Sequence, residues 1–297
     1  MLRSAVVLVL AGCLAASLAP PARADLSEKL GVLGGDDAKG YLSPLPKALS
    51  STLNAGIFQT GRVPETGFGF ALSLHAMGVT FGSGDRTFQT TATPQFPSVS
   101  APTVVGSTGS VAVKGQGNLV SNFPGGLDIS QFVAAAPQLS IGTVMGTRAV
   151  LRYFSDDIGN SDFGKLELFG IGAQHSISRY LRSIPADVAI GAFYQTFKLG
   201  DGLLDTKAFH VDVTASRDFG RVLKLQPYVS VGYDTFNMDV AYTSSSDPTD
   251  KISVKMDTQS NAHLAVGAQL SLAALHLSGE VFSAANSGAA LGLSVGL

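Results

Sequence analysis

Residues 263–283 read HLAVGAQLSLAALHLSGEVFS, two alternating runs joined by Ala273-Ala274. Apolar residues occupy every second position of both runs, and the positions between them hold small or polar residues such as His263 and Gln269. A period of two is that of a β-strand with one apolar face. Because two residues between runs suffice only to turn the chain back, the stretch predicts an antiparallel hairpin.

The same alternation recurs along most of the chain after Gly67. It is found in residues 67–74, 138–153, 165–180, 187–195, 209–214, 224–234 and 291–297. Several runs exceed the ~9–11 residues with which a strand crosses a bilayer. Residues 67–297 therefore predict an all-β fold, a transmembrane antiparallel up-and-down β-barrel of about ten strands.

Composition favours this barrel over a soluble β-sandwich. Charged residues make up 14% of the chain and the mean hydropathy is +0.27, whereas soluble domains hold roughly 25% charged residues. A sandwich would carry many charges on its wet faces, but the second face here is mostly Gly, Ala, Ser and Gln. A net charge of -2 and a pI of about 6.2 exclude the basic field expected of a nucleic-acid partner.

The first 24 residues predict a cleaved export signal. Arg3 precedes an apolar run, and Ala22-Arg23-Ala24 is an A-x-A cleavage site. Leu10-Ala11-Gly12-Cys13 is also similar to a lipoprotein box, in which case Cys13 would be lipidated instead. Cleavage after Ala24 leaves a mature chain without cysteine, which excludes disulfides and thiolate chemistry. The expected location is the outer membrane of a Gram-negative bacterium.

Two segments fall outside the alternating pattern. Residues 25–66 contain Ser43-Pro44, a cap followed by Pro at the first helical position, and a leucine stripe at Leu45, Leu49 and Leu53. They predict a short amphipathic helix that is either a plug or a cap of the barrel. Residues 94–136 are rich in Pro, Gly, Ser and Thr and predict an insertion folded into or beneath the barrel, with a small hairpin around residues 104–113.

Polar residues on the second face of the strands are the candidate lumen groups. Those that we single out are Arg148, Arg152, Lys165, Glu167, His210, Asp212, Lys224, His276 and Glu280, accompanied by Gln195, Gln226 and Gln269. They either form a polar track for a solute or fill a narrow barrel with ion pairs. The turn near Gly159 brings Arg152 close to Glu167, which predicts a partly buried pair between them.

The sequence holds none of the familiar catalytic or metal-binding motifs. It lacks H-E-x-x-H, a P-loop, G-x-S-x-G and paired cysteines. We therefore expect no enzyme, no metal and no cofactor. His210 and Asp212 share one strand face, as do His276 and Glu280, and a membrane-embedded hydrolase is the less favoured reading because neither pair adjoins a nucleophile.

Short motifs along the mature chain resemble a known family. They include Tyr41-Leu42-x-Pro44-Leu45, Asp85-Arg86-Thr87-Phe88, Pro137-Gln138-Leu139-Ser140-Ile141-Gly142, Gly170-Ile171-Gly172-Ala173-Gln174-His175 and Leu181-Arg182-Ser183-Ile184-Pro185. The chain resembles an uncharacterised family of bacterial outer-membrane barrels classed as a domain of unknown function. The resemblance implies an outer-membrane barrel and supplies no catalytic residues. The N-terminal helix is loosely similar to the plug of long-chain fatty-acid outer-membrane transporters, whose barrels are larger.

Two functions from different classes follow. The first is passage or binding of a small or apolar solute, with the N-terminal helix and residues 94–136 as gates. The second is a structural or anchoring barrel with a closed lumen. Expected partners are outer-membrane lipid, the barrel-assembly machinery and, for the first function, a small apolar ligand. In both, the last strand, from Leu291, closes the barrel between residues 275–283 and 67–81.

Overall fold

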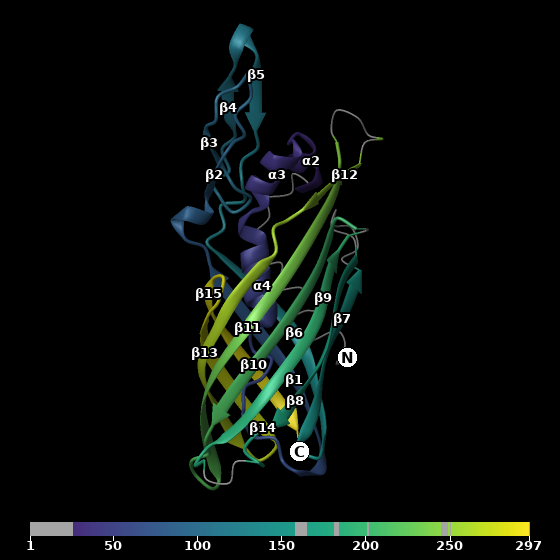
Figure 1. Ribbon diagram of the computed structural model, residues 1–297, viewed down its shortest axis with the longest axis vertical. Coiled ribbons are helices and arrows are strands. Elements are labelled where there is room, and N and C mark those ends of the chain that lie inside the picture. Colours follow the sequence, from purple (N-terminus) through teal and green to yellow (C-terminus); the bar gives the residue numbers. More distant parts are fainter. Residues whose placement is uncertain are drawn as a thin grey trace.

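The computed structural model describes residues 26–157, 165–180, 184–200, 202–244, 249 and 251–296, without the side chains of Ser27 and Phe68. The predicted signal and the Cys13 alternative lie outside these residues. Within them, ten antiparallel strands close a barrel (Figure 1). The strands are β1 (Thr66–Thr80), β6 (Gln131–Val144), β7 (Thr147–Asp157), β8 (Lys165–Ser176), β9 (Asp187–Leu199), β10 (Leu204–Ser216), β11 (Leu223–Thr243), β13 (Gln259–Leu272), β14 (Leu275–Ser283) and β15 (Ser287–Gly296).

Each strand pairs with its sequence neighbour, and β1 pairs with β15 to complete the ring. The register runs from Ala71 opposite Gly296 to Val79 opposite Gly288. A ring without free edges satisfies every backbone group of its strands internally, as a strand in hydrocarbon requires. The barrel class, the strand number and the closing partners of the last strand are confirmed.

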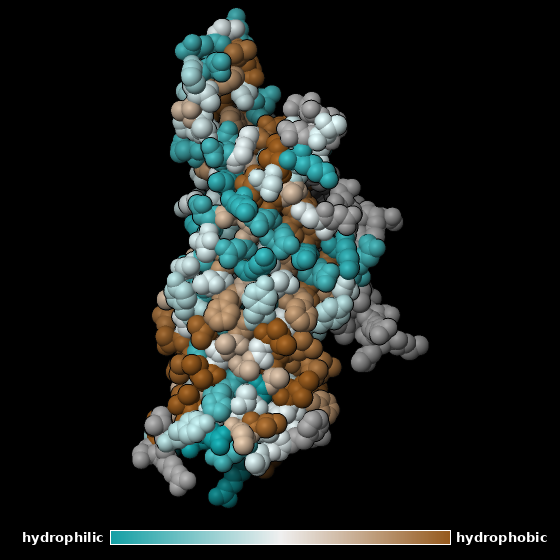
Figure 2. All heavy atoms as spheres, turned by 45° about the vertical axis from the view of Figure 1, so that its right-hand side comes forward, coloured by the Kyte–Doolittle hydropathy of each residue, from teal (hydrophilic) through white to brown (hydrophobic). Residues whose placement is uncertain are grey.

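Side chains alternate across the barrel wall as the period of two predicts. On β15, Leu291, Leu293 and Val295 are 63%, 51% and 56% exposed, while Gly292 is buried. Figure 2 shows hydrophobic side chains gathered on the lower half of the molecule, below a more hydrophilic part. An exposed apolar surface of this extent is unusual for a soluble protein and is the pattern of a lipid-facing barrel.

From residue 26 on, the described chain before the barrel forms the helices α2 (Leu26–Gly31), α3 (Gly35–Leu42) and α4 (Pro44–Asn54). α4 contacts β1, β6, β10, β11, β13 and β15, so it lies inside the barrel. Leu49 and Leu53 are buried there beside Met77 and Phe236, which confirms the apolar stripe. Ser43 does not cap α4 with its side chain, because α3 ends at Leu42 and Ser43 already has helical angles. No helix in the described ranges is long and apolar enough to cross a membrane.

Residues 81–130 form an extension beyond the barrel end (Figure 1). It contains η1 (Ser83–Asp85), β2 (Thr87–Gln89), β3 (Ser100–Pro102), β4 (Val111–Lys114), η2 (Gln116–Asn118) and β5 (Val120–Phe123). The expected insertion at 94–136 is therefore misplaced: it starts earlier, residues 131–136 belong to β6, and it projects outward beside α2 and α3. The expected hairpin at 104–113 is also wrong, since β2 pairs with β3 and β4 with β5.

The strand directions give the barrel two different ends. At the short-turn end β13 and β14 are joined by Ala273-Ala274, and β6 and β7 by Met145-Gly146. At the other end, the long-loop end, lie the extension, α2, α3 and β12 (Lys251–Lys255), which lengthens the sheet at β11.

Candidate functional site

The chain between α4 and β1 runs down through the barrel lumen. We call residues 55–65 the strap, and α2 to α4 together with the strap the plug (residues 26–65). Gly56 has φ +66, a left-handed conformation that ends the helix and starts the descent. Residues 55–59 are all buried, and at the far end Glu65 accepts a hydrogen bond from the backbone of Gly146 at the short-turn end.

Arg152 on β7 is completely buried and holds the end of α4. Its Nη1 donates to the carbonyl of Leu53 at 2.8 Å and its Nη2 to that of Ala55 at 3.0 Å. Its Nε donates to Oε1 of Gln138 at 2.9 Å, and Gln195 also donates to Leu53 at 2.8 Å. A cation at the C-terminal carbonyls of a helix is favourable because these groups lack helical partners and carry the negative end of the dipole.

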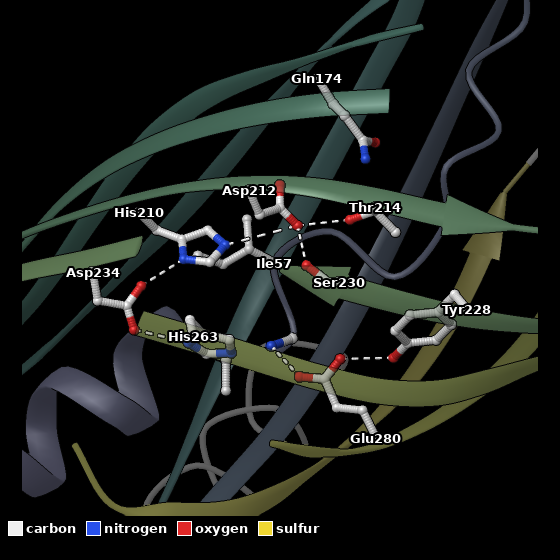
Figure 3. Close-up of polar contacts among 12 residues, drawn as sticks. Ile57, Gln174, His210, Asp212, Thr214, Tyr228, Ser230, Asp234, His263 and Glu280 are labelled. Carbon is white, nitrogen blue, oxygen red and sulfur yellow. Dashed lines mark hydrogen bonds and ion pairs between the residues drawn. The ribbon is translucent and has the colours of Figure 1, made fainter. Parts of the chain in front are cut away.

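Glu280 on β14 also binds the strap, but with a carboxylate that accepts hydrogen bonds, where Arg152 donates them. Its Oε1 accepts from the backbone N–H of Gly56 at 2.8 Å, and its Oε2 accepts from the hydroxyl of Tyr228 at 2.7 Å (Figure 3). Lower down, Ser278 donates to Gln59 at 2.6 Å. The wall thus offers donors where the strap has carbonyls and an acceptor where it has an N–H.

A third group of lumen side chains lies on β10, β11 and β13. Asp234 accepts from His210 Nδ1 at 2.6 Å through one oxygen and from His263 Nδ1 at 2.8 Å through the other. Asp212, on the other side of His210, accepts from Thr214 and Ser230 at 2.6 Å each (Figure 3). The hydroxyls therefore donate to a carboxylate, and neither donates to an imidazole as a nucleophile would to its base.

The short-turn end is partly hollow on both sides of the strap. One cavity of about 420 Å³ is lined by residues including Arg62, Arg179 and Arg217. Another of about 420 Å³ is lined by residues including Arg62, Arg221 and Lys224. Arg62 pairs with Asp218 between them. At this end it is the strap that closes the lumen.

The structure divides the candidate residues predicted from sequence. Arg148, Arg152, His210, Asp212 and Glu280 face the lumen. Lys165 and Glu167 do not: they pair with one another at 3.2 Å at the long-loop end, with side chains 57% and 42% exposed. The expected Arg152–Glu167 pair is wrong, because Arg152 lies opposite Gly170 and Glu167 opposite Ser155.

The remaining two candidates line the mouth. Lys224 is exposed there, and His276 is half-buried and bonded to Ser271 at 2.7 Å. His276 and Glu280 do not act together, since Glu280 lies deeper and binds the strap.

Sequence reasoning missed several residues of the site. Asp234 and His263 stood on the polar face of their strands but were not singled out, because their partners lie on other strands. Gln138 was not singled out either, and although Gln195 was expected in the lumen, a single sequence holds no signal that both would bind the plug backbone. The sequence does not show that the strap lies inside the lumen, and without that position the partners of these residues cannot be recognised.

Comparison with known proteins gives a family. A family model described as a family of unknown function (DUF6588) matches residues 2–297. No curated protein matches. Among solved structures, the chain is similar to a loop L8 deletion mutant of OmpT, an outer-membrane protein of Vibrio cholerae, at 11% identity over 79% of this chain and 100% of that one, with a TM-score of 0.28. It is also similar to the Ralstonia pickettii toluene transporter TbuX, at 12% identity over 80% and 90%, with a TM-score of 0.28.

Proposed function

Because the chain belongs to DUF6588, a family of unknown function, we propose its function from the lumen: it is an outer-membrane barrel for passage of a small or apolar solute, gated by the plug. The observation that carries the proposal is how the wall binds the strap. Arg152, Gln138, Gln195 and Glu280 direct their hydrogen bonds to the backbone and side chains of residues 53–57 or to groups that hold them.

Binding through the plug backbone makes the plug separable from the wall. If the plug moved, the same wall groups would face water or a solute. The upper lumen would then present apolar residues such as Met77, Phe236 and Met238, and the lower lumen the polar groups. The cavities beside Arg62 already lead from the short-turn end to the strap. An apolar section followed by a polar one suits a solute that is small and mainly apolar.

The alternative is a structural barrel with a permanently closed lumen. It is favoured by the burial of residues 51–59 and by their many hydrogen bonds. The two functions differ in one property, which is whether the plug leaves the lumen in the folded protein.

A reversible lock on α4 distinguishes them. Ser51 is buried and its Oγ accepts from the backbone N–H of Asn286 at 2.8 Å, so we expect cysteines at these neighbouring positions to come close enough for a disulfide. The chain's one cysteine, Cys13, precedes the predicted cleavage site. We expect Ser51→Cys/Asn286→Cys in planar bilayers to lose its current openings when oxidised and to regain them when reduced.

Two comparisons complete this experiment. Each single-cysteine variant should be insensitive to the redox state, and deletion of residues 26–60 should give a larger steady current. A passage function is ruled out if the locked, reduced and deleted proteins all carry the same current, and the structural barrel then stands.

A further inference from the structure

Three side chains from neighbouring strands converge in the barrel wall, behind the strap. His210 lies on β10, Asp234 on β11 and His263 on β13, and their exposed fractions are 3%, 0% and 2%. One nitrogen or oxygen of each lies within 4.8 Å of those of the other two. Both imidazoles turn Nδ1 toward the same carboxylate, at 2.6 and 2.8 Å (Figure 3). Imidazole nitrogens and a carboxylate oxygen at such separations are a ligand set for a transition metal.

The charge around these residues favours a cation. Asp234 and Asp212 are both buried, and within 4.0 Å of their oxygens the cationic groups in the described part of the chain are the two imidazoles. Arg148 attracts Asp212 only from farther away. For cations at close range to balance both carboxylates, both imidazoles would have to be protonated with ring centroids 5.1 Å apart. A divalent ion supplies both charges while the imidazoles stay neutral.

Asp212 provides a second observation that points to a metal. Its Oδ2 is 3.9 Å from Nε2 of His210, on the side of the ring away from Asp234. Histidines that bind metals through one nitrogen characteristically direct the other toward a carboxylate, which fixes the ring and its tautomer. Thr214 and Ser230 in turn hold that same Oδ2, so the carboxylate beside Nε2 of His210 has a fixed position.

The surroundings of the two rings keep them in place. Phe58 of the strap stacks on His210 with centroids 6.2 Å apart, and Phe282 stacks on His263 at 5.6 Å. Gly232 lies opposite Asp212 on β11, and a Cβ there would be 2.9 Å from the Cβ of Asp212 and 3.2 Å from Cε1 of His210. Because Gly232 has no side chain, Asp212 and His210 have room for the positions that they occupy.

We propose that Nδ1 of His210, Nδ1 of His263 and the carboxylate of Asp234 bind one divalent transition-metal ion of the class that prefers imidazole and carboxylate ligands, such as Zn²⁺, Ni²⁺ or Cu²⁺. The ion takes the place of the two Nδ1 protons, which pass to solvent. It joins β10, β11 and β13 at the level of Phe58. This site is independent of solute passage, and it replaces the expectation of no metal drawn from sequence motifs.

The test uses the full mature chain without an affinity tag, refolded into detergent after treatment with a chelator. Because the site is buried, Zn²⁺, Ni²⁺ or Cu²⁺ alone is added during refolding, and bound metal is counted after gel filtration. We expect one ion per chain, and a Cu²⁺ electron paramagnetic resonance spectrum split by two imidazole nitrogens.

Variants assign the ligands. His263→Gln and Asp234→Asn should lose the bound ion, and Asp212→Asn should weaken binding by roughly 10–100-fold. His276→Gln, in the cavity at the mouth, is the matched control and should bind as the natural chain does. Metal that stays bound to His263→Gln, or a natural chain that refolds without retaining an ion, overturns the proposal. Should the variants fail to refold, the two-nitrogen Cu²⁺ spectrum of the natural chain decides alone.

Discussion

Arg152 is the residue on which the plug most depends. Replacing it with Met keeps an unbranched apolar stem but removes three hydrogen bonds, and it leaves the carbonyls of Leu53 and Ala55 without that donor. Removing one partner of a buried charged network costs about 3–5 kcal/mol. We expect Arg152→Met to lower the free energy of unfolding in detergent by about that amount. The measurement is a urea titration followed by circular dichroism or by tyrosine fluorescence, since the chain has no tryptophan.

Glu167→Ala is the control for this measurement. Among the residues that the structure describes, its carboxylate pairs with exposed Lys165, and exposed pairs are worth about 0–1 kcal/mol. Equal losses in the two variants would mean that Arg152 does not hold the plug.

At this scale the sequence predicts which residues face inward but not what they bind. The period of two placed Arg152, His210, Asp212 and Glu280 on the lumen face because alternation is a property of each strand alone. Their partners are set by register across strands and by the strap. Lys165 and Glu167 alternate with buried Leu166 and Leu168, so they lie on the outer face of β8, and the sequence prediction gave this strand the wrong phase.

At the scale of secondary-structure elements, the extension and the helices of the plug are joined by hydrogen bonds and close packing. Lys29 of α2 donates to the carbonyl of Gly125 at 2.9 Å, and the hydroxyl of Tyr41 of α3 donates to it at 3.1 Å. Burial lowers the pKa of Lys29 and raises the pKa of Tyr41, both of which lie outside the barrel. Gly40 packs so closely on Phe88 that a Cβ would be 2.2 Å from its ring. The extension is thus an anchor for the helices of the plug.

Removing the extension should therefore loosen the plug and leave the barrel intact. Thr80 of β1 lies opposite Gln131 of β6, so a tight turn in place of residues 83–128 joins two strands that are already paired. We expect this variant to keep the heat-modifiable gel mobility of a folded barrel and to pass more current in planar bilayers. Replacing only η2 by an Asn-Gly turn is the control. An unchanged current after the full replacement would show that α4 and the strap hold the plug without help.

Most barrel strands were predictable from the sequence, but residues 138–153, which alternate as a single run, form parts of β6 and β7 and turn at Met145-Gly146. Strands have to alternate in order to face lipid, and that constraint is visible in one sequence. The extension is held by contacts such as those of Gly125 and Phe88 with helices far away in the chain, and composition indicated only that it is not regular barrel. Its small strands pair in an order that local turn residues do not reveal.

For the molecule as a whole, the closing pair of strands was the most predictable feature of the fold. A membrane barrel cannot leave an edge unpaired, so the first and last alternating runs have to meet. The plugged lumen was not predictable to the same extent. The leucine stripe of α4 requires an apolar surface to pack on, and a helix that caps the barrel would find one just as a helix that plugs it does.

Closure of the barrel depends on β15, and the proposed outer-membrane location depends on that closure. β15 pairs with β1 from Ala71 to Val79 and with β14 from Leu275 to Ser283. Without it, both of those strands expose backbone groups to hydrocarbon, where each unsatisfied group costs several kcal/mol. Deleting residues 287–297 should abolish heat-modifiable mobility and remove the chain from the outer-membrane fraction of a Gram-negative host.

Leu297→Phe is the matched control, because it changes the C-terminal residue and keeps all of β15. It should insert as the natural chain does, or better if the assembly machinery recognises a terminal aromatic residue. The full chain should remain in the membrane fraction and resist protease at its strands. A truncated chain that still inserts and resists protease would require a different closing strand. A full chain found soluble in the periplasm would instead remove lipid as the partner of Leu291, Leu293 and Val295, whose exposed side chains would then need a protein surface to cover them.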